Sequence, residues 1–170
     1  AYAKAQAGAG SPLPTEGKVF VSVANHDKRN VIIYAKMLEQ LGFEIVSTGG
    51  TADVLRRNGV NSTVASKFAE ANGQHSIVDM VRSGEIDLIL NTPAGGAARS
   101  DGYEIRAAAV SVGCPVMTTI SEFAAAVQAI TALREHSWGI ISLQEYNEYL
   151  HTASSGEQED NNQVREGELS

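Results

Sequence analysis

The sequence holds a single cysteine, Cys114, so it excludes a disulfide within one copy of the chain. A lone thiol is typical of proteins from a reducing compartment, and we expect a cytoplasmic protein in which Cys114 is buried and inert. The four histidines have no metal-ligand spacing with Cys114 or with one another. We therefore expect no metal site in this chain.

Long apolar runs and basic charge are also scarce. No apolar run reaches the ~18 residues that a membrane span requires. The formal net charge is −7 at pH 7 and the pI is about 5.0, which argues against a surface for nucleic acid or anionic lipid. An anion that binds this chain must therefore be held by a local pocket. The first residues lack an initiator methionine and the apolar region of a signal peptide, so we expect a piece of a longer chain.

The composition bounds the domain organisation. With 170 residues, 43% hydrophobic and 6% aromatic, the chain can build one core of α/β type. Residues 1–16 are rich in Ala and then punctuated by Gly and Pro, which predicts a linker. Residues 152–170 are acidic and poor in bulky apolar side chains, which predicts a disordered tail. The folded domain is expected over residues 17–151.

Within residues 17–151, short apolar runs alternate with runs of helical periodicity. The predicted strands are 18–23, 43–46, 60–64, 86–90 and 115–117. The predicted helices are 31–41, 52–59, 77–83, 101–112, 121–133 and 142–150, with Asp101 and Ser121 at the start of theirs. Because right-handed crossovers keep such strands parallel, we expect a doubly wound α/β sandwich, with helices on both faces of a five-stranded, mainly parallel sheet.

The segment from Phe43 to Leu55 predicts a strand, a tight turn and a helix. Gly49 and Gly50 let the backbone approach a bound group, and the first N–H groups of the helix have no intrahelical acceptor. Such a turn can bind an anion, and Thr48 and Thr51 place hydroxyl groups beside it. An equally weighted interpretation is that a threonine caps the helix and the glycines only form the turn. This segment by itself leaves both interpretations open.

Ligands of doubly wound sheets bind beyond the carboxyl ends of the strands, and polar residues follow each predicted strand there. The candidate phosphate-binding residues are Lys28, Thr48, Gly49, Gly50, Thr51, Lys67, Asn91, Thr92 and, less directly, Thr118. The two lysines supply positive charge, and Asn91 can read a ribose or a base edge. Arg99, in the loop after the fourth strand, can reach a ligand or a neighbouring subunit.

Acid–base candidates are few at this edge of the sheet. His26, Asp27 and Asp101 are ionisable, but each also fits a helix cap or an exposed loop position. We therefore expect no catalytic residue in this chain.

Several of these runs, in this order and spacing, are those of a known family. They are Gly17-Lys18-Val19-Phe20-Val21-Ser22-Val23, Asp27-Lys28, Leu41-Gly42-Phe43, Thr48-Gly49-Gly50-Thr51-Ala52, Ser83-Gly84-Glu85, Asn91-Thr92-Pro93, Asp101-Gly102-Tyr103-Glu104-Ile105-Arg106 and Thr118-Thr119. From about Gly17 to Leu150 the chain resembles the carboxy-terminal allosteric domain of the carbamoyl-phosphate synthase large chain, which has a methylglyoxal-synthase-like fold.

The resemblance implies regulation. The parent enzymes use ATP with Mg or Mn to make carbamoyl phosphate for pyrimidine and arginine synthesis, and this domain binds the inhibitor UMP and, in some members, the activator IMP. Family nucleotide contacts match Lys28, Thr48, Gly50, Thr51, Lys67, Asn91 and Thr92. The implied partners are the rest of the large chain, a small glutaminase subunit and further copies of the chain.

Two positions depart from the family pattern. Pro93 stands where a third polar residue is common, and Val116 stands where some members have the tyrosine that helps to hold ornithine, so this ornithine contact is not carried over. The rival interpretation is a methylglyoxal synthase acting on dihydroxyacetone phosphate, which uses an aspartate base where this chain has Asn91. An amide cannot take that proton. An oligomerisation module is a third interpretation, compatible with regulation.

Overall fold

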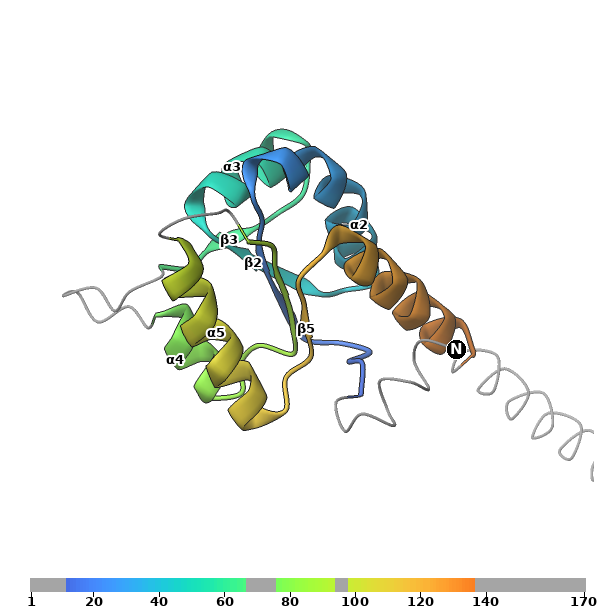
Figure 1. Cartoon of the computed structure of the whole chain (residues 1–170). Helices are drawn as coiled ribbons and strands as arrows, with labels where there is room; N and C mark the ends of the chain where they lie inside the picture. Colours follow the sequence, from blue (N-terminus) through green and yellow to red (C-terminus); the bar gives the residue numbers. More distant parts are fainter. Residues whose placement is uncertain (1–11, 67–75, 94–97, 137–170) are drawn as a thin grey trace, which may run out of the picture. The chain divides into compact units, whose positions relative to one another are not determined.

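The computed structural model of the chain describes residues 12–66, 76–93 and 98–136 (Figure 1). The chain divides into two units, residues 1–131 and 132–170, and only residues 132–136 of the second are described, as helix. Most of the predicted linker, the predicted helix over 142–150 and the acidic tail lie outside the described residues. Within the described part, no helix has both the length and the apolar character needed to cross a membrane.

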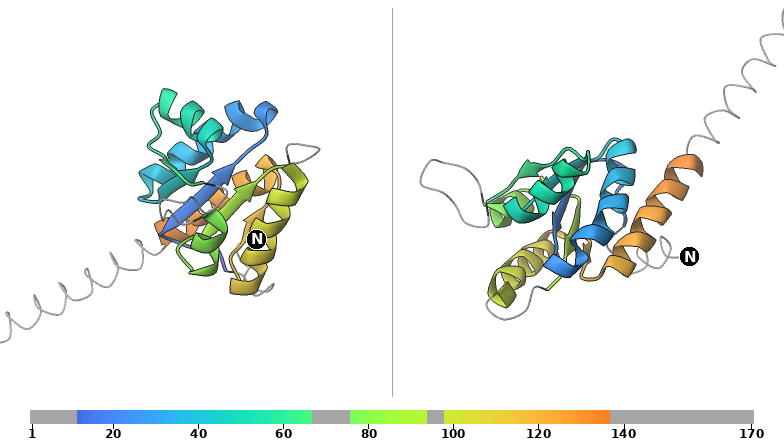
Figure 2. Two further views of the ribbon diagram at one scale, coloured as in Figure 1. Left: turned by 90° about the vertical axis from the view of Figure 1, so that its left-hand side faces the viewer. Right: turned by 90° about the horizontal axis from the view of Figure 1, so that it is seen from above.

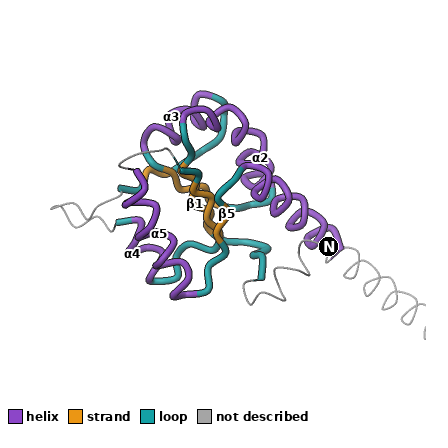
Figure 3. The backbone as a smooth tube through the Cα atoms, viewed as in Figure 1, coloured by secondary structure: helices purple, strands orange, loops and turns teal. Residues whose placement is uncertain are grey.

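The first unit is built on a sheet of five parallel strands (Figure 3). The strands are β1 (Lys18–Ser22), β2 (Glu44–Ser47), β3 (Thr63–Val64), β4 (Leu88–Asn91) and β5 (Val116–Met117). Their order across the sheet is β3-β2-β1-β4-β5, and every neighbouring pair is parallel. The predicted doubly wound sheet is thereby confirmed, and it is parallel throughout.

Helices cover both faces of this sheet, as Figure 2 shows. They are η1 (Asn25–Asp27, a 3-10 turn), α2 (Lys28–Gln40), α3 (Gly49–Arg57), α4 (Ile77–Arg82), α5 (Ala98–Val112) and, without a label in the figures, residues 120–131. Side chains of α2, α3 and residues 120–131 enter one core cluster, and those of α4 and α5 enter a second. The helices between β1 and β3 therefore cover one face of the sheet, and the helices between β3 and β5 cover the other.

Alternation along the strands assigns side chains to the two clusters. Val19 and Val21 face the cluster under α2, whereas Phe20 between them faces α4 and α5. All four residues of β4 are buried, as expected for a parallel strand covered on both faces. Leu13, in the segment predicted as linker, is 8% exposed and packs into the first cluster.

The predicted strand over 60–64 is wrong in its first half, because β3 contains only Thr63 and Val64. The residues before it are held by side chains rather than by a strand ladder. The guanidinium of Arg56 donates to the carbonyl oxygen of Ser62 at 2.9 and 2.6 Å, and Asn61 donates its backbone N–H to the carboxylate of Glu39 at 2.9 Å. Apolar composition alone could not reveal these bonds.

Two predicted helix starts are also wrong. α5 begins at Ala98, so Asp101 lies inside the helix instead of capping it. The helix after β5 begins at residue 120 rather than at Ser121, and a reciprocal capping box closes its first turn. In that box Glu122 donates its N–H to Thr119 Oγ1 at 3.1 Å and accepts from the Thr119 N–H at 3.3 Å.

Candidate functional site

Polar side chains meet where β1, β2 and β4 end, at the carboxyl edge of the sheet. Ser22, the last residue of β1, pairs in register with Asn91, the last residue of β4. Ser22 Oγ lies 3.2 Å from Thr48 Oγ1, and Thr48 Oγ1 donates to Thr51 Oγ1 at 3.4 Å. We call Ser22, Thr48, Thr51, Asn91 and Thr92 the polar row. The row places four of the predicted site residues side by side and adds Ser22.

Two threonines of the row brace the loop between β1 and α2. Thr92 Oγ1 accepts the backbone N–H of Ala24 at 2.8 Å, and Thr51 Oγ1 accepts that of Val23 at 3.4 Å. Both threonines are buried, 5% and 2% exposed. Their hydroxyl groups are therefore engaged in fixing the loop that leads to Lys28.

The start of α3 leaves backbone donors open. The helix begins at Gly49, and its N-cap residue Thr48 makes no side-chain capping bond, so a threonine cap on this helix is not formed. The N–H groups of Thr51 and Ala52 both donate to the Thr48 carbonyl, at 2.9 and 2.8 Å. Within the described residues the N–H groups of Gly49 and Gly50 form no backbone hydrogen bond, and both residues are exposed. This geometry can bind an anion.

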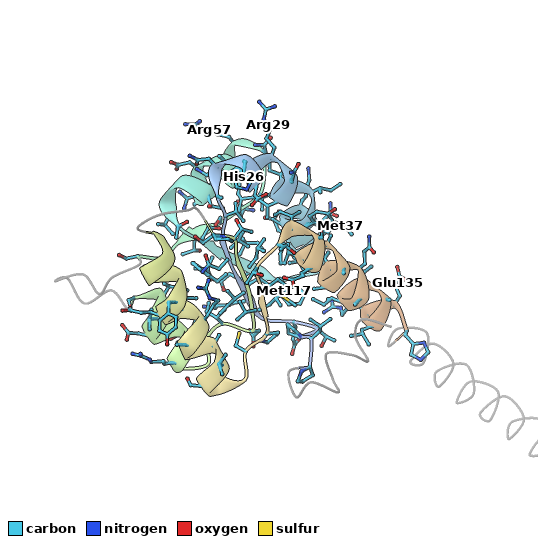
Figure 4. The ribbon with its side chains drawn as sticks, viewed as in Figure 1. His26, Arg29, Met37, Arg57, Met117 and Glu135 are labelled. Atoms are coloured by element: carbon cyan, nitrogen blue, oxygen red, sulfur yellow. The ribbon has the colours of Figure 1, made fainter. Side chains whose placement is uncertain are left out.

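Lys28 places its charge at this helix start. Its ammonium nitrogen lies 3.2 Å from the position that a Cβ on Gly50 would occupy. Lys28 is half-buried, and no carboxylate among the described residues lies within 4.0 Å of it. Arg29 and Arg57, in contrast, point away from the ribbon into solvent (Figure 4).

The position of Lys28 is electrostatically unfavourable without a ligand. Lys28 is the first residue of α2 and also faces the first turn of α3. A cation at a helix N-terminus opposes the helix dipole and typically costs 0.3–1 kcal/mol, whereas an anion there is stabilised. The N-terminus of α3 and the Lys28 ammonium group therefore form a positive centre that a bound anion would neutralise, whereas the N-terminus of α2 already has the carboxylate of Asp27 at its N-cap position.

The other end of the polar row reaches α5. The Nδ2 atom of Asn91 and the Nη1 atom of Arg106 lie 3.0 and 3.1 Å from the position of a Cβ on Gly102. Asn91 is 8% exposed, and Arg106 is half-buried. Sequence reasoning missed Arg106 as a site residue, because its neighbour Asn91 is near it only after the chain has folded.

With this geometry in place, the chain can be compared with known proteins. The sequence profile of the MGS-like domain family matches residues 30–118, which is more than half of the chain. The chain belongs to the MGS-like domain family. The predicted family is thereby confirmed.

Related sequences are longer proteins. This MGS-like domain is 61% identical over 159 residues to the carbamoyl phosphate synthase large chain of Kocuria rhizophila, covering 92% of the chain and 14% of that protein. It is 62% identical over 160 residues to the same protein of Pseudarthrobacter chlorophenolicus, again covering 92% of the chain and 14% of the relative. The chain thus spans about one-seventh of the curated relatives that it matches.

A solved structure also matches the domain. Methylglyoxal synthase from Elizabethkingia anophelis superposes with a TM-score of 0.49 at 14% identity, over 68% of this chain and 79% of that one.

Other predicted site residues of the MGS-like domain stand apart from the polar row. Lys67 lies outside the described residues, as does the side chain of Arg99. Thr118 donates its hydroxyl group to Glu122 Oε2 at 3.3 Å and its N–H to the same oxygen at 2.8 Å, so it belongs to the cap of the helix after β5.

Two of the three acid–base candidates, His26 and Asp27, form a pair, and the side chain of Asp101 lies outside the described residues. His26 Nε2 lies 3.3 Å from Asp27 Oδ2, and the His26 side chain is 78% exposed. Asp27 is the N-cap residue of α2 but makes no side-chain capping bond. Within the described residues, no three His, Cys, Asp or Glu side chains cluster closely enough to hold a metal ion.

A cavity of about 290 Å³ lies away from the polar row, beside the first residues of β2. It is lined by Glu39, Phe43, Glu44, Ile45, Arg56, Asn61, Ser62 and Thr63. Glu39 and Arg56 already bond the loop before β3, and Glu44 pairs with Lys18 at 3.5 Å. Each of its three charged side chains therefore has a partner within the domain.

Proposed function

We propose that this MGS-like domain is the carboxy-terminal regulatory domain of a cytoplasmic carbamoyl-phosphate synthase large chain. In this proposal, residues 17–151 form the domain, residues 1–16 link it to the ATP-using part, and residues 152–170 are a tail. The parent enzyme would use ATP with Mg or Mn and a small glutaminase subunit, and copies of the chain would associate. The high identity to large chains over 92% of this chain supports the assignment.

The ligand that the proposal assigns to the polar row is a nucleoside monophosphate such as UMP, with IMP as a second candidate. The observation that carries it is the Lys28 ammonium nitrogen 3.2 Å from the Cβ position of Gly50. A phosphate in this place would accept from Lys28 and from the open N–H groups of Gly49 and Gly50. Lys67, and less directly Arg99 and Thr118, are proposed as further contacts on the resemblance alone.

The proposed ligand is bound and not converted. Proton abstraction requires a base close to the substrate, and β4 ends in Asn91, whose amide has no basic lone pair. Binding would instead alter ATP use in the parent enzyme through a coupling free energy, typically 1–3 kcal/mol.

Isothermal titration calorimetry with UMP tests this proposal. Lys28→Ala should weaken UMP binding roughly 10- to 100-fold, the value of one charge-assisted hydrogen bond. Lys36→Ala is the matched control, because Lys36 is an exposed lysine two turns further along the same helix. Equal affinities of the two variants for UMP would contradict the proposed binding of the phosphate by Lys28. Sustained release of methylglyoxal from dihydroxyacetone phosphate would instead support the lyase.

A further inference from the structure

Asn91 and Arg106 bring two N–H donors to one point at the carboxyl edge of the sheet. Asn91 Nδ2 and Arg106 Nη1 each lie within 3.1 Å of the place where Gly102 would carry a Cβ. Gly102 and Arg106 are four residues apart on α5, so they occupy the same face of the helix. Residues of two elements, β4 and α5, therefore define one position.

The absence of a side chain at residue 102 makes room for this pair. Glycine inside a helix costs roughly 1 kcal/mol relative to alanine, so the helix itself gains nothing from it. A Cβ would meet Asn91 Nδ2 at 3.0 Å and Arg106 Nη1 at 3.1 Å. Both groups would have to shift by a few tenths of an ångström, and Asn91 is nearly buried.

Arg106 can donate hydrogen bonds at this position but cannot accept them. A guanidinium carries five N–H donors and no acceptor, so it donates in every orientation. Rotation of the Asn91 amide would exchange a donor for an acceptor, and Arg106 alone therefore fixes the polarity of this position. Within the described part of the chain, no carboxylate lies within 4.0 Å of the Arg106 guanidinium.

The polar row connects this position to the proposed phosphate-binding position at Gly49 and Gly50. Asn91 is the register partner of Ser22, and Ser22 Oγ lies 3.2 Å from Thr48 Oγ1 at the start of α3. A ligand whose phosphate lies at Gly49 and Gly50 would extend along the row toward α5. The nucleoside part of such a ligand would then face a group that only donates.

We propose that Arg106, positioned by Gly102 and Asn91, makes the site select bases that present a keto oxygen over bases that present an amino group. This inference rests on the proposed nucleotide function. A keto oxygen accepts from the guanidinium, whereas an exocyclic amino group would put two donors opposite each other. UMP and CMP share the O2 oxygen and differ at position 4, which carries a keto oxygen in UMP and an amino group in CMP, and at N3, which carries a proton in UMP and none in CMP.

Calorimetry with UMP and CMP on the 170-residue chain tests the inference. The unaltered chain should bind UMP about 10- to 100-fold more tightly than CMP, the value of one hydrogen bond to a charged group. Arg106→Gln should bring this ratio close to one, mainly by weakening UMP binding. Arg82→Gln, in the last turn of α4 and exposed, is the matched control and should keep the ratio.

Gly102→Ala provides a second variant that keeps the charge. It should reduce the UMP/CMP ratio, and circular dichroism checks that the helix still forms, because alanine favours a helix but its Cβ would lie 3.0 Å from Asn91 Nδ2. If Arg106→Gln weakens UMP and CMP equally, the residue acts on the shared phosphate or ribose and the inference is wrong. If UMP fails to bind, or binds equally well to Lys28→Ala, the proposed function fails and the inference fails with it.

Discussion

The ammonium nitrogen of Lys28 lies 3.2 Å from the point where a side chain on Gly50 would begin. The two residues belong to different helices, α2 and α3, and each stands in the first turn of its own. The glycine therefore does more than allow a turn, because it leaves the space in which a lysine can reach a helix N-terminus.

Replacing Gly50 by alanine should weaken UMP binding several-fold. The added Cβ would displace the Lys28 ammonium group, whereas alanine improves helix propensity, so the thermal midpoint should stay equal or rise. Calorimetry and thermal denaturation measure the two effects. Gly49→Ala is the control, because no atom lies within 4 Å of the Cβ position there. An equal loss in both variants would show that Lys28 is not the cause.

UMP binding should tighten as the pH rises from 5 to 7. The second pKa of a phosphate monoester is about 6, so the ligand gains its second negative charge in this interval. An additional unit charge about 4 Å from an ammonium group contributes roughly 1 kcal/mol in water, or about five-fold in affinity. Titrations at several pH values measure the change, and affinity that does not vary with pH would contradict recognition of the dianion.

The helix that begins at residue 120 should contribute strongly to stability through Phe123. This side chain is fully buried, and its ring lies edge-on to that of Tyr34 with centroids 6.5 Å apart. Phe123→Ala should lower the free energy of unfolding by about 3–5 kcal/mol, through lost burial and the cavity left behind. Val110→Ala, at a position 80% exposed on α5, should change it by less than about 0.5 kcal/mol. Urea denaturation compares the two variants, and similar values would contradict the core assignment.

Cys114 should react slowly with alkylating reagents in the folded chain. Burial, aided by the Asp87 carboxylate, raises the pKa of its thiol to about 12. At pH 8 iodoacetamide should therefore label the unfolded chain much faster than the native one. Because the folded state holds the proton more tightly, the related stability is complete below the ordinary thiol pKa and is lost as the pH approaches 12. Equal labelling rates in native buffer and in urea would contradict this environment.

Local sequence patterns predicted the layers of the fold well. Apolar runs such as that around Phe20 and the helical period of α2 depend on neighbours within a few residues, and both elements form where expected. The predicted boundaries of strands were wrong where side chains distant in the sequence determine them. Arg56 and Glu39 hold the chain before β3 in a loop, and these contacts cross between elements.

Some residues of the candidate site could likewise be identified from the sequence, and others could not. Gly49 and Gly50 could be identified from the sequence because a strand, a glycine pair and a helix follow one another directly. Arg106 could not, because its approach to Asn91 depends on how α5 packs beside β4. The bracing roles of Thr51 and Thr92 also require the fold, since their partners are backbone N–H groups of the loop after β1.

The central claim is that the open N–H groups at the start of α3 receive the phosphate of a nucleotide. Titration of the ¹⁵N-labelled chain with UMP, followed by NMR, tests it most directly, with uridine as the ligand that lacks the phosphate. The amide resonances of Gly49 and Gly50 should shift most with UMP and remain in place with uridine. Saturation by UMP with both resonances unchanged, or the same shifts with uridine, would contradict it.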